Sequence, residues 1–134
     1  MAAVESNMEM KEFERVRQDK KGYKRFFTDD LFDLYVWYTK KNGSITGFQL
    51  VYEKWTNPRA FTWLKDKGYR HDRIDGYDSN RWNLTPILVA NGYLDKKSIA
   101  DKFFEHSKRI DKEIVTLVYR TLVDYDPEKG NQGI

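Results

Sequence analysis

Three polar residues on one predicted strand could carry chemistry together. His71, Arg73 and Asp75 are spaced two residues apart, so their side chains would share one face of that strand. An imidazole beside a carboxylate can act as an oriented general base, and a guanidinium can bind a carboxylate or a phosphate. With Trp63, expected opposite His71 on the preceding strand, and with Arg81, they would form an enzyme site or a binding site for a small anion. The competing interpretation is a solvated polar face, since the sequence marks no nucleophile and no second catalytic group.

A group of aspartates is a second candidate. Asp29, Asp30 and Asp33 could hold a divalent cation, but they lack the spaced ligands of a calcium loop. The two histidines of the chain are too few and too scattered for zinc, and His106 is expected on the solvated side of a helix. We therefore predict a turn at the aspartates, with no metal and no cofactor.

Aromatic rings near cations suggest a third kind of site. A sheet that exposes rings with cations at its rim can stack single-stranded bases. However, the expected RNP-like motif is absent, and so is the split order of strands and helices found in such RNA-binding sheets. The residues of this display are Tyr35, Trp37, Trp63 and Tyr69, with Lys65, Lys67 and Arg70.

Common catalytic motifs and thiol chemistry are missing from the chain. The sequence contains no Walker loop, Gly-x-Gly-x-x-Gly, Gly-x-Ser-x-Gly or His-Glu-x-x-His. There is no cysteine, which excludes disulfides and thiolate sites. The formal net charge of +3 comes from 24 basic and 21 acidic residues that alternate in sign along most of the chain, the pattern of a mixed solvated surface. We assign no catalytic residue.

The bulk composition predicts one soluble domain. The chain has 134 residues, of which 40% are hydrophobic and 16% aromatic, which is enough to form a core without disulfides or a structural metal ion. No apolar run approaches the roughly 18–20 residues of a membrane span, and the first ten residues do not resemble a secretory signal. A cytoplasmic location with no membrane partner is expected.

The strongest structural signal is Asn42-Gly43, which lies between two runs of aromatic and β-branched residues. This pattern predicts a β-hairpin. A three-residue loop with Gly43 in the left-handed position pairs Val36 with Phe48 and keeps one apolar set on one face, which a one-residue slip would destroy. That face consists of Phe32, Leu34, Val36, Phe48 and Leu50.

The remaining patterns predict an α+β domain. Further strands are expected over 23–28, 59–65 and 68–75, with a short edge strand or connector over 86–90. Helical spacing follows after Asp95 and after Asp111, each a predicted N-cap. We predict an antiparallel meander of four to five strands with two C-terminal helices packed on one face. Residues 1–22 are expected to be a weakly ordered arm, 23–125 the domain and 126–134 a flexible tail.

The expected function is binding rather than catalysis. Tyr35 and Trp37 lie on the second face of the hairpin, with Trp37 opposite Gly47, and Trp63 is expected to extend this aromatic face. Because aromatic residues are enriched at interfaces, this face would serve a protein-interaction module or a homodimer. The alternatives are a site for a small anionic ligand on the predicted strand of His71 and binding of single-stranded nucleic acid.

A resemblance accompanies this interpretation. The strings LFDLYVWY from Leu31, ITGFQLVYEK from Ile45 and RAFTW from Arg59 are similar to those of a group of small uncharacterised bacterial proteins, as are GYRHDRID from Gly68 and TPIL from Thr85. The similarity spans about Phe26 to Leu122. It implies a bacterial, cytoplasmic, single-domain protein, and it brings no activity, cofactor or catalytic residue with it.

Overall fold

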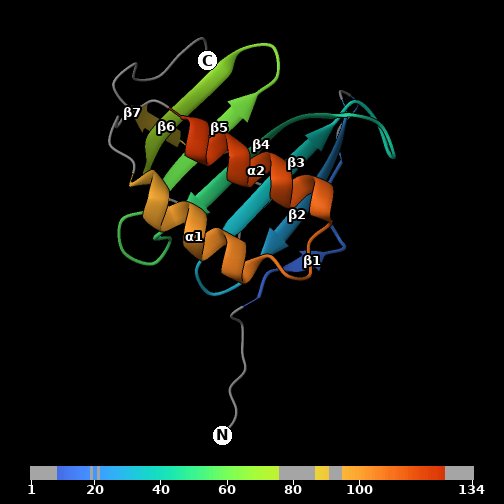
Figure 1. Ribbon diagram of the computed structural model, residues 1–134. Helices are drawn as coiled ribbons and strands as arrows, with labels where there is room; N and C mark the ends of the chain where they lie inside the picture. Colours follow the sequence, from blue (N-terminus) through green and yellow to red (C-terminus); the bar gives the residue numbers. More distant parts are fainter. Residues whose placement is uncertain (1–8, 19, 21, 76–86, 91–94, 126–134) are drawn as a thin grey trace, which may run out of the picture.

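The protein was analysed as a computed structural model, which describes residues 9–18, 20, 22–75, 87–90 and 95–125. Within these residues, seven strands form one antiparallel sheet whose spatial order follows the chain (Figure 1). The strands are β1 (Lys11–Phe13), β2 (Tyr23–Thr28), β3 (Asp33–Tyr38), β4 (Ile45–Tyr52), β5 (Arg59–Leu64), β6 (Gly68–Asp75) and β7 (Ile87–Ala90). The count exceeds the predicted four to five: β7 forms the edge strand that was one of the two alternatives expected over 86–90, and β1, which was not predicted, pairs with β2 at the other edge.

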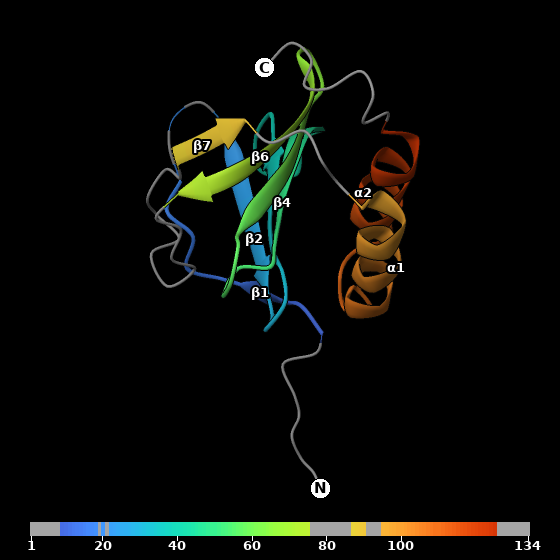
Figure 2. The same cartoon turned by 90° about the vertical axis from the view of Figure 1, so that its left-hand side faces the viewer.

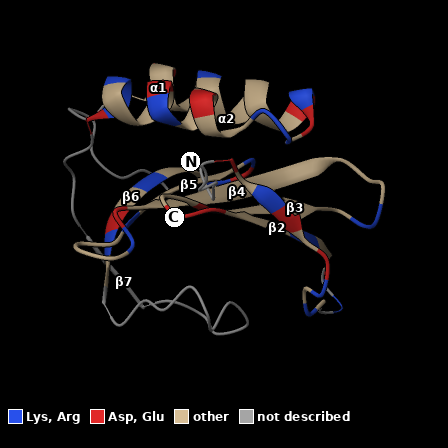
Figure 3. Ribbon diagram, turned by 90° about the horizontal axis from the view of Figure 1, so that it is seen from below, with Lys and Arg blue, Asp and Glu red and all other residues tan. Residues whose placement is uncertain are grey.

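Two helices form a second layer on one face of the sheet. Helices α1 (Lys96–His106) and α2 (Lys112–Asp124) lie side by side over the strands, as the two side views show (Figures 2 and 3). The predicted α+β class, with both C-terminal helices on one face, is confirmed. The main core lies between the layers, where the residues 0% exposed include Leu34, Val36, Phe48, Leu50, Phe61, Phe103, Val118 and Leu122.

The central hairpin has the predicted register, but its turn differs in detail. Val36 lies opposite Phe48, and Trp37 lies opposite Gly47. Asn42, not Gly43, takes the left-handed conformation, with a φ of 63°. Asparagine tolerates this region better than most residues, so it can replace the expected glycine there. The register shift falls between Trp37 and Tyr38, at the end of the hairpin.

The next hairpin is shifted by two residues from the expected pairing. Trp63 lies opposite Tyr69, and His71 lies opposite Phe61. The loop closes one residue earlier than predicted, because Lys67 donates its N–H to the carbonyl of Leu64 at 3.0 Å and Gly68 takes a φ of 99°. A shift of two residues leaves Trp63 and His71 on the same side of the sheet as each other, as predicted.

The second face of the sheet is also buried. Phe26, Tyr35, Val51, Ala60 and Ile74 form a separate apolar cluster there, each at most 5% exposed. Phe13 and Val16 pack against this cluster. The segment predicted as a loose arm therefore contributes both a strand and part of a core, and Met10 within it is 0% exposed. The predicted tail, 126–134, lies outside the described residues.

Candidate functional site

The predicted base His71 lies inside the protein. It is 0% exposed, on the face that the helices cover, and its Nε2 is hydrogen-bonded to the hydroxyl of Tyr52 at 2.5 Å. The two rings stack at 5.9 Å with an interplanar angle of 9°. Burial raises the pKa of Tyr52 well above its usual range. His71 is thus placed as a core residue that a ligand from solvent does not reach.

Among the other polar members of the predicted anion site, only Arg73 has a described side chain. Arg73 is exposed and lies opposite Arg59 on β5. Asp75 is described only through its backbone, which pairs with Ile87 of β7, and Arg81 lies outside the described residues. Arg73 and Arg59 therefore lie on neighbouring strands, while His71 itself is closed off from solvent.

The three predicted aromatic binding residues are divided between the two faces. Tyr35 is 5% exposed in the second cluster, and Trp37 packs against that cluster while remaining half-buried. Trp63 lies opposite Phe48, on the face that the helices cover. The expected continuous aromatic face is therefore wrong, because Trp63 and Trp37 point to opposite sides of the sheet.

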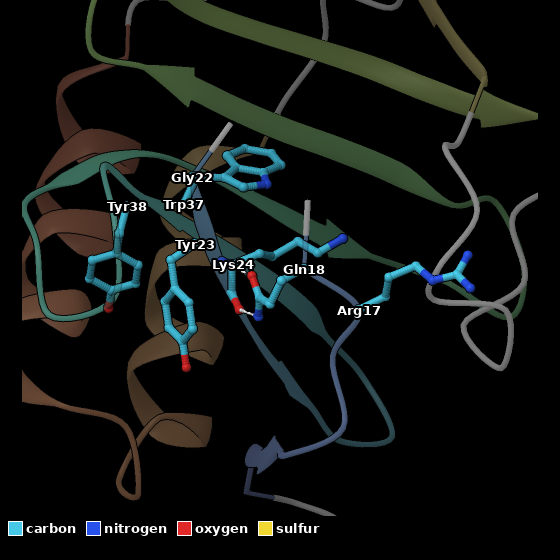
Figure 4. A pocket seen from close by; sticks show the side chains of 7 residues that line it. All are labelled: Arg17, Gln18, Gly22, Tyr23, Lys24, Trp37 and Tyr38. Carbon is cyan, nitrogen blue, oxygen red and sulfur yellow. Dashed lines mark hydrogen bonds between the residues drawn. The ribbon is translucent and has the colours of Figure 1, made fainter. Parts of the chain in front are cut away.

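A small cavity of about 150 Å³ lies beside Trp37 at the start of β2 (Figure 4). Lys24 and Gln18 border it, and the Gln18 amide exchanges two hydrogen bonds of 2.7 Å with the backbone of Lys24. The side chains of Tyr23 and Tyr38 lie together on the other side, with ring centroids 6.1 Å apart. The amide pairing shows that Gln18 extends the sheet edge in place of a strand, so we interpret this cavity as a gap at that edge.

A lysine and a histidine bind the aspartate cluster. The Lys54 ammonium lies 2.8 Å from Oδ1 of Asp33 and 2.5 Å from the carbonyl of Asp29, and the Lys54 and Asp33 side chains are only 3% and 0% exposed. The Asp29 carboxylate caps the turn by accepting the N–H of Phe32 at 2.8 Å, and its second oxygen lies 2.7 Å from Nδ1 of His106.

These contacts give the aspartate cluster a structural role in the turn between β2 and β3. The predicted turn is confirmed, whereas the prediction that His106 is solvated is wrong, because His106, the last residue of α1, is only 4% exposed. Its partner carboxylate comes from the turn between β2 and β3, so the pair fastens the helix layer to the sheet. No group of three residues able to hold a metal ion occurs in the described part of the chain.

A large depression lies between the tip of the β3–β4 hairpin and α2. It has a volume of about 930 Å³, and we call it the hairpin–helix groove. Ile45, Trp63 and Leu117 contribute half-buried apolar side chains that also pack on the main core. The remaining lining residues are Asn42, Gly43, Ser44, Lys65, Lys112, Glu113, Thr116 and Arg120.

The rim of the groove carries an excess of positive charge. Lys65, Lys112 and Arg120 are exposed, against the single carboxylate of Glu113. Within the described residues, the side chains of these three cations form no salt bridge or hydrogen bond. Their charge is therefore not neutralised by neighbours in the fold.

The same end of the molecule concentrates the net charge of the chain. The hairpin tip 39–46, the loop 64–68 and the segment 111–120 hold six basic and three acidic residues. This difference equals the whole formal net charge of +3, so the rest of the sequence is balanced. A positive potential at one end would attract anions toward the groove.

An arginine fixes the helix that forms one wall of the groove. Arg25 on β2 binds Glu12 through two hydrogen bonds of 2.8 Å, and it reaches Oδ2 of Asp111 at 3.0 Å and the Tyr38 hydroxyl at 3.2 Å. The hydrogen bonds to Glu12 raise the pKa of Arg25 above its usual value, so it stays charged. Asp111 occupies the predicted N-cap position of α2, but it makes no side-chain cap bond. Its carboxylate instead binds the start of the helix to the sheet.

Sequence reasoning identified Trp63 and Lys65 but missed the helical wall. Lys112, Thr116 and Arg120 are spaced by four residues, which places them on one side of a helix. That spacing was the available signal. It does not reveal which strand ends the polar side of the helix would face.

Comparisons of the chain with models of protein families, with curated proteins and with solved structures found no match. The group of bacterial proteins expected from the resemblance therefore stays a prediction. Neither of the described helices has the length and apolar character that a membrane crossing requires.

Proposed function

We propose that this protein is a binding module for a negatively charged ligand, held in the hairpin–helix groove. The observation that carries the proposal is the combination of an apolar, aromatic floor with three cations whose side chains have no partner among the described residues. A volume of about 930 Å³ lies within the range of small-molecule sites. An aromatic or apolar part of the ligand would pack on the floor, and the acidic group of the ligand would lie beside the cations of the rim.

The positions of the candidate residues favour this groove over the sites predicted from sequence. Trp63 borders open space in the groove, whereas Tyr35 and His71 are buried. Exposed cations around a partly apolar floor interact with anions more strongly than they would on a flat surface, because the floor lowers the local dielectric.

The proposal is tested with 8-anilinonaphthalene-1-sulfonate, an aromatic anion whose fluorescence rises on binding. The double variant Lys65→Gln/Lys112→Gln removes two rim cations and leaves the apolar floor intact. We expect its affinity to fall about fivefold to tenfold, from the modest value of each exposed charge contact. We also expect binding to the wild type to weaken as salt is added.

The matched control is Lys102→Gln/Lys108→Gln, which removes two exposed charges outside the groove. It should bind the probe as the wild type does. Equal affinity of the groove variant and the control variant would refute the proposal, as would binding that salt does not change.

A further inference from the structure

Helix α2 is apolar on two sides. Its inner side buries Ile114, Val118 and Leu122 in the main core. Its outer side carries Val115, Tyr119 and Val123 at spacings of four residues. A surface helix of a globular domain normally has one apolar stripe. Val115 and Tyr119 are half-buried and also touch the main core, whereas Val123 at the end of the outer stripe is exposed.

Helix α1 extends the outer stripe of α2. Phe104 is 61% exposed and Val123 is 46% exposed, and these are two of the four large apolar side chains that are exposed in the described residues. The rings of Phe104 and Tyr119 lie 5.8 Å apart across the two helices. Together with Val115, these side chains line a shallow groove of about 380 Å³, which we call the outer helical groove.

The charges at this groove are of both signs. Arg120 and Asp124 line it together, one turn apart on α2. A face with one cation and one anion on the same helix is complementary to itself. When two copies meet about a two-fold axis, Arg120 of each copy can approach Asp124 of the other, while the apolar side chains meet between them.

We propose that the outer helical groove is the contact surface between two copies of this chain. This surface lies on the side of the helices away from the sheet. Thr116 and Arg120 line both grooves, but Phe104 lines the outer helical groove and not the hairpin–helix groove, so a Phe104 variant tests the dimer separately from the ligand. Two helices of this length present on the order of 500 Å² per copy, less than the roughly 800 Å² of a standard stable interface. The dimer is therefore weak and depends on protein concentration.

The test is sedimentation equilibrium of the full chain from low-micromolar to millimolar concentration. Phe104→Ala should raise the dimer dissociation constant by roughly tenfold or more, because exposed aromatic anchors dominate such contacts. Leu31→Ala is the matched control, since Leu31 is exposed at 39% and lies outside the groove. Unchanged thermal melting would show that each variant is folded.

A charge exchange tests the two-fold arrangement itself. Arg120→Glu and Asp124→Arg should each weaken the dimer, because each places like charges together across the interface. The double variant should recover most of the wild-type affinity. A strictly monomeric wild type would overturn the proposal and leave the surface to a different partner. A dimer that Phe104→Ala does not weaken, or a double variant no better than the single ones, would also overturn it.

Discussion

Replacement of Lys54 by methionine tests the buried ion network at the β2–β3 turn. Methionine keeps the length of the side chain but removes the ammonium that bonds Asp33 Oδ1, the Asp29 carbonyl and the Thr28 hydroxyl. Asp33 would remain as a carboxylate that is 0% exposed, without its cation. Loss of one partner of a buried pair costs about 3–5 kcal/mol.

This loss is large for a domain of this size. Single domains unfold with about 5–15 kcal/mol, so the variant should lose at least about a fifth of its stability. With a urea dependence of about 1.5 kcal/mol per molar, the unfolding midpoint should fall by about 2–3 M. Equilibrium unfolding in urea, followed by tryptophan fluorescence and circular dichroism, measures this shift.

Two further variants separate the charge effect from the shape of the side chain. The double variant Lys54→Met/Asp33→Asn removes both charges and should recover most of the loss, because replacing both members of a buried pair is often nearly neutral. Lys65→Met, at an exposed lysine, should change stability by less than about 0.5 kcal/mol. A loss below about 1 kcal/mol for Lys54→Met, or no recovery in the double variant, would show that the network does not stabilise the turn as we infer.

Two other predictions concern the sheet. Burial raises the pKa of Asp72 above its ordinary 3.8, although hydrogen bonds from Arg70 act in the opposite direction. The buried carboxylate therefore does not destabilise the fold at pH values below 3.8. It does so increasingly as the pH rises through the folded-state pKa of Asp72. Urea unfolding should therefore show Asp72→Asn gaining stability relative to the wild type from acidic to neutral pH, and a constant difference would contradict this. In Gly47→Ala, the new Cβ would lie 2.6 Å from the Trp63 carbonyl oxygen and 2.6 Å from Leu64 Cδ2, so we expect a loss of about 1–3 kcal/mol. Ser44→Ala on the same hairpin is the control, and equal stability of the two variants would refute the close approach.

Local patterns in the sequence predicted much of the fold. The Asn42-Gly43 signal and the alternation around it were sufficient to place Val36 opposite Phe48, because only one register gathers the apolar side chains on one face. Helical spacing likewise identified α1 and α2, with Asp95 capping α1 through the Ser98 N–H. These features depend on neighbours within a few residues of one another.

The side of the sheet on which Trp63 lies could not be predicted in the same way. It depends on the register between β4 and β5, which is set by the irregular loop that joins them. Glu53 in this loop takes a φ of 51°, a conformation that its residue type does not predict. One residue more or less in that loop would place Trp63 on the same face as Trp37, which is the predicted arrangement.

Contacts between residues far apart in the sequence account for the other features that local patterns did not predict. Lys54 neutralises an aspartate 21 residues earlier in the chain, and His106 bonds one 77 residues earlier. The hairpin–helix groove joins residues of β4, β5 and α2, so it exists only once the helix layer has docked. No local spacing reveals which charged side chains such docking brings together.

The short strands at the two margins of the sheet have a consequence for solubility. β1 has three residues and β7 has four, whereas the inner strands have six to eight, and β3 and β4 among them are largely apolar. A long exposed edge strand would offer its row of unpaired N–H and C=O groups to other chains and would promote aggregation. The short outer strands expose few N–H and C=O groups with which another chain could pair. Edge-to-edge growth of the sheet into fibrils is therefore disfavoured, while the inner strands keep their buried apolar side chains.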